Sequence, residues 1–227
     1  MKKALKEIQE RIRQAAVDAG RDPEAITLVA VSKTQSAETV RQGIEAGIRH
    51  LGENYIQEAI KKMDELTASE VTWHFIGHLQ SNKAKYAVGR FDWLHGVDSR
   101  KLARTLDREA EKQNLIQKVL IEVNIAGEDS KFGVAEDQVA DLAKEIGAMA
   151  HLSLRGLMTM PPLFNDPEGV RPFFSALRRL RDDIGKLELP GVRMEELSMG
   201  MTGDFEAAVA EGATMVRIGT AIFGARS

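Results

Sequence analysis

Hydrophobic residues along the chain form eight short runs that are rich in β-branched side chains, separated by longer amphipathic stretches. Such runs are typical of buried strands. We predict strands at residues 27–31, 48–52, 72–76, 93–97, 118–124, 153–158, 195–199 and 215–219. The intervening stretches contain good helix formers and capping residues, such as Ser36 before residues 37–40 and Asp98 or Ser99 before residues 100–103. Before the first run, residues 3–19 have apolar positions at helical spacing and end at Gly20, which predicts one amphipathic helix.

Strand and helix units that alternate eight times predict a parallel sheet, which can close into a (β/α)8 TIM barrel. The pattern alone leaves an open, doubly wound sheet as the alternative. The chain has 227 residues and shows no internal repeat and no long linker, so we expect one domain, residues 1–227. Four of the six prolines lie within residues 160–172. They predict a loop after the sixth strand, either at the functional rim of the barrel or as a plain connector.

Composition narrows the class of protein. Hydrophobic residues make up 43% and charged residues 29%, as in an ordinary globular protein. A net charge of -3 and a pI near 6.0 leave no basic surplus for nucleic acid or anionic lipid, so we expect neither partner. The absence of cysteine excludes disulfides and thiolate chemistry. The chain begins without the apolar run of a signal peptide, and no segment has the length of a membrane span, which predicts a cytoplasmic protein.

Lys33 directly follows the first predicted strand. A lysine in this position can lose part of its hydration, which makes the neutral, nucleophilic amine more accessible for attack on an aldehyde. An end-of-strand lysine also occurs as an ordinary surface residue whose stem packs on apolar neighbours. The segment 215–220 at the other end of the chain supports the functional interpretation, because it offers groups suited to a phosphate.

A phosphate site is predicted where the seventh and eighth strands end. Ser198 and Thr202 precede a short helix predicted at 205–210, and the amides of Gly219 and Thr220 follow the last strand. A helix N-terminus and hydroxyl groups can hold a phosphate without a lysine, and barrels often use the loops after strands seven and eight for this purpose. The alternative for each residue alone is an N-cap or a turn.

Two further groups of residues are assigned structural roles. His74 and His78 share a strand parity, but no third ligand lies at metal spacing, so a hydrogen-bonded structural histidine is favoured over zinc. The run Arg178, Arg179 and Arg181 with the acidic pair 182–183 is typical of a solvated helix face.

Six segments resemble the pyridoxal phosphate homeostasis proteins, small relatives of the alanine racemase barrel. They are Val29-Ala30-Val31-Ser32-Lys33-Thr34, Gly52-Glu53-Asn54-Tyr55, the run 73–83 (WHFIGHLQSNK), Arg155-Gly156-Leu157-Met158, Leu197-Ser198-Met199-Gly200-Met201 and the run 216–224 (VRIGTAIFG). The resemblance covers nearly the whole chain.

The resemblance implies a single (β/α)8 barrel of the alanine racemase N-terminal type, preceded by a helix, that binds pyridoxal 5′-phosphate as an internal aldimine of Lys33. It implies no metal. The cofactor-binding residues that it implies are Lys33, Asn54, Ser198, Met201, Thr202, Arg217, Gly219 and Thr220. Arg217 would face the pyridine nitrogen. A guanidinium stays charged and cannot take a proton from that nitrogen, so the ring would be a poor electron sink.

The function implied is intracellular homeostasis of pyridoxal phosphate (vitamin B6) without catalytic turnover, in a monomer that hands the cofactor to apoenzymes. The alternative is an amino-acid racemase of low activity, which needs an acid/base group on each face of the substrate α-carbon. Lys33 could serve one face. Alanine racemases take the other group from a C-terminal domain, and this sequence offers no evident source for it. Tyr55 could reach the rim but is expected to serve packing.

Overall fold

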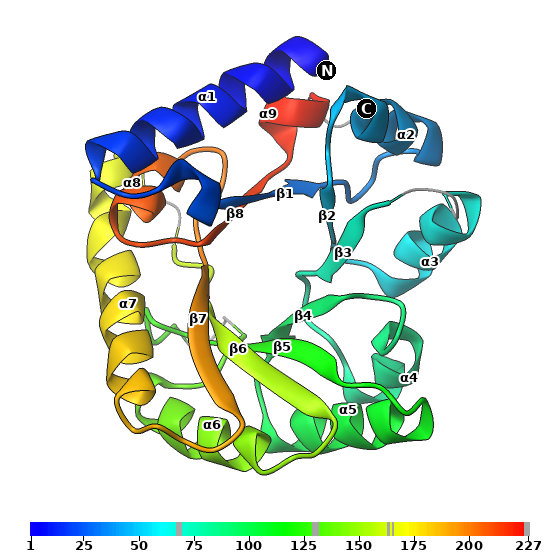
Figure 1. Ribbon diagram of the computed structural model, residues 1–227, viewed down its shortest axis with the longest axis vertical. Coiled ribbons are helices and arrows are strands. Elements are labelled where there is room, and N and C mark those ends of the chain that lie inside the picture. Colours follow the sequence, from blue (N-terminus) through cyan, green and yellow to red (C-terminus); the bar gives the residue numbers. More distant parts are fainter. Residues whose placement is uncertain (67–69, 129–131, 163, 165, 225–227) are drawn as a thin grey trace.

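Eight parallel strands close into a barrel in the order β1-β2-β3-β4-β5-β6-β7-β8, with the helices on the outside (Figure 1). This computed structural model describes residues 1–66, 70–128, 132–162, 164 and 166–224. The strands are β1 Thr27–Val31, β2 His50–Glu53, β3 Thr72–Phe75, β4 Trp93–Val97, β5 Gln117–Glu122, β6 Leu152–Met158, β7 Val192–Ser198 and β8 Met215–Ile218. The barrel closes where β1 pairs with β8, from Thr27 beside Met215 to Ala30 beside Ile218. The predicted TIM barrel is confirmed, and the open sheet is excluded.

Helices alternate with the strands. The α-helices are α1 Lys2–Asp18, α2 Ala37–Ala46, α3 Ile56–Glu65, α4 Ala84–Ala87, α5 Arg100–Lys112, α6 Val139–Gly147, α7 Arg171–Gly185, α8 Phe205–Ala210 and α9 Thr220–Phe223. Short 3-10 turns are η1 Pro23–Ala25, η2 Ser81–Lys83, η3 Glu136–Gln138 and η4 Pro167–Val170. The Ser36 hydroxyl accepts a hydrogen bond from the Thr39 amide and caps α2, and Ser99 caps α5 in the same way. Both predicted caps are confirmed.

Element boundaries differ from the sequence prediction mainly after β6. The predicted loop at 160–172 is partly wrong, because η4 begins at Pro167 and α7 begins at Arg171. Proline fits the first turn of a helix, since the amide that it lacks has no partner there. The Asp166 carboxylate also accepts a hydrogen bond from the Glu168 amide, which starts the turn early. Residues 163 and 165 of the predicted loop lie outside the described residues.

The barrel has two apolar layers. The larger one lies between the strands and the surrounding helices and includes Phe75, Phe174 and Phe205, all essentially inaccessible to solvent. A separate cluster consists of Val29, Trp93, Leu120, Met158 and Met215, contributed by five different strands. Alternate strand residues point inward in a barrel, so this cluster fills its interior. The interior also contains buried polar side chains, which the functional site uses.

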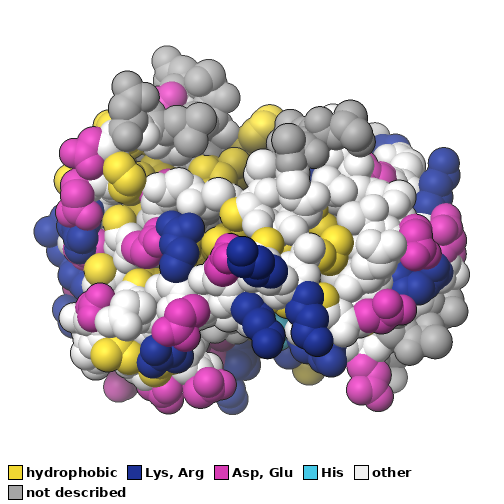
Figure 2. Space-filling model, turned by 90° about the horizontal axis from the view of Figure 1, so that it is seen from above, with side chains coloured by type: hydrophobic (Ala, Val, Ile, Leu, Met, Phe, Trp, Pro, Cys, Tyr) yellow, Lys and Arg dark blue, Asp and Glu magenta, His cyan; other side chains and the backbone are white. Residues whose placement is uncertain are grey.

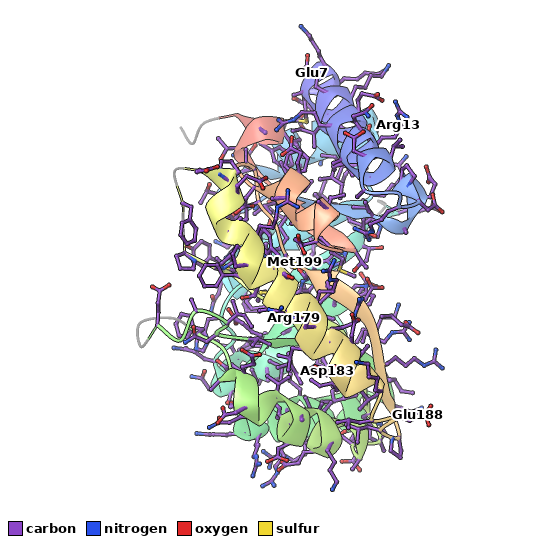
Figure 3. All side chains as sticks on the ribbon, turned by 90° about the vertical axis from the view of Figure 1, so that its left-hand side faces the viewer. Glu7, Arg13, Arg179, Asp183, Glu188 and Met199 are labelled. Atoms are coloured by element: carbon purple, nitrogen blue, oxygen red, sulfur yellow. The ribbon has the colours of Figure 1, made fainter. Side chains whose placement is uncertain are left out.

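Helix α1 packs against α8 and α9, beside the junction of β8 and β1 (Figure 1). Acidic and basic side chains are interspersed on the face that carries this helix (Figure 2). On α7, Arg179 and Asp183 lie on the exposed side, as predicted for a solvated face (Figure 3). Within the described part of the chain, no helix is long and apolar enough to cross a membrane.

Candidate functional site

A cavity of about 150 Å³ lies at the carboxyl ends of the strands. Its lining includes seven of the eight residues that the sequence predicted for cofactor binding. They are Lys33, Asn54, Met201, Thr202, Arg217, Gly219 and Thr220, and Val31, Ile76 and Met160 complete the lining. These residues come from β1, β8 and the segments that follow β1, β2, β3, β6, β7 and β8. Parallel closure of the barrel therefore assembles one site from distant parts of the sequence.

Ser198, the eighth predicted residue, does not line this cavity. It ends β7, is fully buried, and its Oγ lies 2.7 Å from Nη1 of Arg217 and 2.9 Å from Nδ1 of His95. Its hydroxyl thus belongs to a polar network in the barrel interior. Ser198 is connected to the cavity by its hydrogen bond to Arg217.

The guanidinium of Arg217 is held on several sides. Nη1 donates to Ser198, and Nη2 donates to the carbonyl oxygen of Thr159 at 2.9 Å. The Arg217 amide donates to the carbonyl oxygen of Gly200, also at 2.9 Å. Gly200 has a φ of 93°, a backbone conformation that favours glycine, and an added Cβ would lie 2.6 Å from Cβ of Ala208. The turn after β7 therefore depends on glycine and fixes the strand that carries Arg217.

Arg217 is buried, with 3% of its surface exposed, yet it retains its charge at neutral pH. Burial lowers its pKa to about 10, while the negative charges of Glu122 and Asp204 favour the charged form. Burial also raises the pKa of Glu122 to about 7, helped by the charge of Asp98 and opposed by Arg217. The cavity is therefore bordered by a fixed cation, and one of the two carboxylates near this cation, Glu122, is partly neutralised near pH 7.

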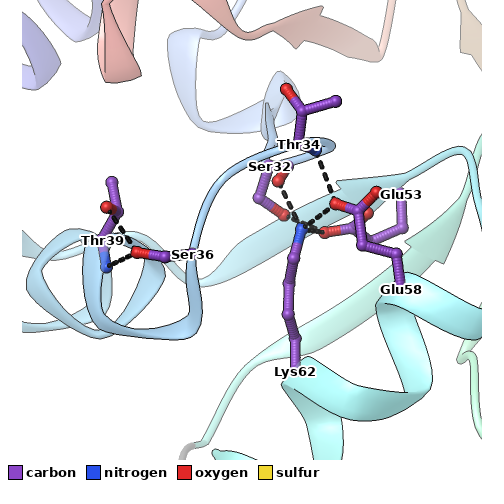
Figure 4. Close-up of polar contacts among 7 residues, drawn as sticks. All are labelled: Ser32, Thr34, Ser36, Thr39, Glu53, Glu58 and Lys62. Atoms are coloured by element: carbon purple, nitrogen blue, oxygen red, sulfur yellow. Dashed lines mark hydrogen bonds and ion pairs between the residues drawn. The ribbon is translucent and has the colours of Figure 1, made fainter. Parts of the chain in front are cut away.

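The turn that carries Lys33 is held in a strained conformation. Thr34 has a φ of 65°, which is rare for a β-branched residue and costs about 1–3 kcal/mol. The Thr34 amide donates to Oε1 of Glu58 at 2.5 Å, and the Ser32 hydroxyl donates to Oε1 of Glu53 at 2.6 Å (Figure 4). Because both flanking residues are bonded to neighbouring elements, the direction in which Lys33 leaves the barrel wall is fixed.

Lys62 on α3 connects these bonds. Its Nζ lies 2.7 Å from Oε1 of Glu53, 2.6 Å from Oε1 of Glu58, and 2.6 Å from the Ser32 carbonyl oxygen (Figure 4). Burial raises the pKa of Glu53, and the bonded Lys62 opposes that shift. The sequence analysis missed this cluster. A lysine on the apolar face of α3, between Ala59 and Leu66, was the signal that could have revealed it.

The cavity offers polar groups to a ligand. Oδ1 of Asn54 is buried and has no hydrogen-bond partner among the described residues, so it can accept a hydrogen bond from a ligand or pack against one. At Gly219, an added Cβ would approach the Val31 carbonyl oxygen to 3.1 Å, which is unusually tight. Helix α9 begins at Thr220, so the first amides of α9 lie beside the cavity, and Thr202 adds a hydroxyl from the neighbouring loop after β7. These donors suit a phosphate.

Three histidines continue the network below the cavity. The Nε2 atom of His95 lies 2.9 Å from Nδ1 of His74, and Nε2 of His74 lies 3.0 Å from Nδ1 of His50. His74 is thus a hydrogen-bonded structural histidine, as predicted, whereas His78 lies 3.1 Å from an Asp98 carboxylate oxygen and stacks on Phe132. No group of three or more metal-ligating side chains occurs among the described residues. The network was missed, although one histidine on each of three successive predicted strands was visible.

The closed barrel, the lysine after β1 and the buried arginine on β8 define a (β/α)8 barrel with a lysine-bearing site at the carboxyl ends of its strands. The family model "Alanine racemase, N-terminal domain" matches residues 4–227, and the chain belongs to this family. It is 42% identical to the pyridoxal phosphate homeostasis protein of Aquifex aeolicus, over 98% of this chain and 96% of the relative. The protein of the same name from Escherichia coli K12 is also 42% identical, over 98% and 95% of the two chains.

Solved structures show the same architecture. PipY of Synechococcus elongatus PCC7942, with PLP bound, has a TM-score of 0.83 and 38% identity, over 96% of this chain and 100% of PipY. An alanine racemase of Clostridium difficile 630 has a TM-score of 0.74 at 12% identity, over 94% of this chain and 54% of the racemase. At that identity the racemase shares the fold alone.

We predict that Lys62→Met destabilises the protein by about 3–5 kcal/mol, because it leaves the buried Glu53 carboxylate without its cation. For a chain of this size, that loss corresponds to a melting temperature lowered by roughly 6–20 °C, measured by calorimetry or circular dichroism. The control is Lys61→Met on the exposed side of the same helix, which should change little. Equal melting temperatures for the two variants would contradict a structural role for Lys62.

Proposed function

We propose that the chain binds pyridoxal 5′-phosphate in the cavity at the carboxyl ends of the strands and serves pyridoxal phosphate homeostasis. The relatives with that name are about as similar to the chain as PipY, which has been solved with PLP bound. The observation that carries the proposal concerns the lining of this cavity. Seven predicted cofactor-binding residues, including Lys33 and Arg217, line one cavity.

Each part of the cavity has a distinct role in this proposal. Lys33 would hold the cofactor through Nζ, because the bound cofactor would supply an aldehyde carbon that an amine can capture with loss of water. Thr202 and the amides of Gly219 and Thr220 bind the phosphate, and Met201 packs beside it. Asn54 and Arg217 line the same cavity and would contact the ring, with Arg217 at the pyridine nitrogen. Ser198 contributes by holding Arg217.

We propose that this site does not turn over amino acids. The bound cofactor supplies an electrophilic carbon and a pyridine ring that can accept electrons. Arg217 stays charged and can only donate a hydrogen bond, so a nitrogen that faces it acts as the acceptor, which disfavours a protonated ring and weakens the ring as an electron sink. Among the described lining residues, Lys33 is the one whose side chain could serve as a general base. Tyr55 is exposed and does not line the cavity. A racemase needs a second group on the opposite face.

The proposal extends to how the protein operates. It acts as one domain and as a monomer in the cytoplasm, and it releases the cofactor to apoenzymes. An open rim supports this proposal, because Met160, Met201 and Thr220 are partly accessible where the cavity meets solvent.

We predict that pyridoxal phosphate added to the purified protein gives a visible absorption band that borohydride converts into a covalent adduct at Lys33. The Lys33→Ala variant should show neither the band nor the adduct. Lys83→Ala, at the same end of the barrel but outside the cavity lining, is the control and should retain both. Peptide mapping by mass spectrometry locates the adduct. An adduct that persists in Lys33→Ala would refute the assignment of this lysine.

We predict that the cofactor-loaded protein does not exchange the α-hydrogen of single-enantiomer amino acids in deuterated water, because no second acid/base group lines the cavity among the residues that the structure describes. Proton NMR of the recovered amino acid and chiral chromatography measure exchange and racemisation. Exchange that depends on Lys33 would show racemase chemistry and would overturn the absence of turnover while leaving cofactor binding intact.

A further inference from the structure

An unbroken line of hydrogen bonds crosses the barrel interior from Arg217 to His50. It runs from Arg217 to Ser198 at 2.7 Å, to His95 at 2.9 Å, to His74 at 2.9 Å and to His50 at 3.0 Å. These side chains come from β8, β7, β4, β3 and β2. His50 is the first residue of β2, whereas Ser198 is the last residue of β7. The line therefore connects the two ends of the barrel.

The chemistry of Arg217 favours one direction for the bonds in this line. A guanidinium only donates, so the Ser198 hydroxyl accepts from Arg217. Nδ1 of His95, at 2.9 Å, is the acceptor that the described residues offer to the hydroxyl's own proton, so we assign Ser198 as the donor to His95. A neutral His95 then carries its proton on Nε2 and donates to Nδ1 of His74. By the same reasoning, His74 donates from Nε2 to Nδ1 of His50. All three histidines are thereby set in the Nε2–H tautomer.

The surroundings keep the histidines neutral, as this direction requires. Burial lowers the pKa of His74 to about 3, with further contributions from His50 and Lys118, and burial also lowers the pKa of His95 well below its ordinary value. Burial lowers the pKa of His50 too, although the nearby charge of Asp92 opposes this shift. His74 is also stacked on Trp93, with ring centroids 6.1 Å apart and planes 6° apart. Packing and hydrogen bonds therefore define each ring position.

The outer end of the line reaches a second cavity. His50 lines a cavity of about 740 Å³ at the amino-terminal ends of β1 and β2, between these strands and α1. Lys6, Arg13 and Arg49 line the same cavity. In this direction the last proton of the line is on Nε2 of His50, and His50 is the residue of the line that borders this cavity.

We propose that Ser198 and His95 are positioning residues for Arg217, and that with His74 and His50 they form one polarised relay from the cofactor cavity to the cavity at the amino-terminal end of the barrel. Each acceptor end of the relay faces Arg217, so aligned dipoles stabilise the buried cation and hold its plane. The action of Arg217 on a pyridine ring rests on the proposed function. The existence of the relay does not depend on that function.

The test is the tautomer of each histidine in protein without added ligand. The chain has five histidines, so selective ¹⁵N labelling gives a simple spectrum in which His78 and His151 lie outside the relay. Long-range ¹H–¹⁵N correlation at pH 7.5 shows which ring nitrogen carries the proton. We expect His50, His74 and His95 each as a single Nε2–H tautomer. A proton on Nδ1 of His95, or a mixture of tautomers in the wild type, would overturn the relay.

A variant tests whether Ser198 transmits this order. Ser198→Ala removes the link to Arg217, so the tautomer of His95 should become mixed, and the ¹⁵N resonances of His74 and His50 should shift with it. The matched control is Ser153→Ala on β6, which should leave all five histidines unchanged. Resonances of His74 and His50 that do not move in Ser198→Ala would refute a connected relay. If that variant does not fold, the wild-type tautomers still decide the proposal.

A second readout separates the relay from the proposed function. Ser198→Ala should weaken binding of pyridoxal phosphate by about tenfold or more, as for a lost hydrogen bond to a charged group. Ordered tautomers in a protein that does not bind pyridoxal phosphate would support the relay and refute the proposed function. Mixed tautomers in a protein that does bind it would refute the relay alone.

Discussion

The hydrogen bond from Arg217 to the Ser198 hydroxyl links the cavity at the carboxyl ends of the strands to the histidine network in the barrel interior. On one side of it, the guanidinium borders the cavity that also contains Lys33. On the other side, three neutral histidines fill part of the barrel interior. A buried cation is costly unless it is hydrogen bonded, and here Ser198 and Thr159 accept from it, while Glu122 and Asp204 supply negative charge. The position of the cation, and with it the chemistry open to the cavity, depends on this arrangement.

Much of the fold follows from local pattern. Strands β1 and β4 and helix α8 have the bounds that hydrophobic runs and helix signals predict, because their ends coincide with clear changes in polarity. Barrel closure could not be derived from pattern alone, since pairing of β1 with β8 depends on contacts between residues nearly 200 positions apart. The start of α7 was also missed, because the prolines that indicate a loop fit equally well in the first turn of a helix.

For the candidate site, the sequence identified the residues that border the cavity but few of the residues that hold them. Lys33 and Arg217 lie at the ends of recognisable strands within segments that resemble a known family. Their supports are Lys62, Glu53 and the histidines, which come from other elements and meet only in three dimensions. Ser198 was assigned to a phosphate by its place before a helix, whereas its hydroxyl lies against Arg217 and His95. Burial and tertiary contacts decide such roles, and neither can be recognised from the neighbouring residues in the sequence.

The protonation state of the pyridine nitrogen tests the proposed role of Arg217 most directly, because the charged guanidinium would face that nitrogen and keep the ring from acting as an electron sink. The direct measurement is the ¹⁵N chemical shift of pyridoxal phosphate labelled at that nitrogen and bound to the protein near neutral pH. Its Schiff base with a free amine, recorded in acid and in alkali, supplies the reference shifts. If Arg217 faces the ring, we expect the shift of an unprotonated nitrogen. The shift of a protonated nitrogen would contradict this expectation and would mean that a different group faces the ring.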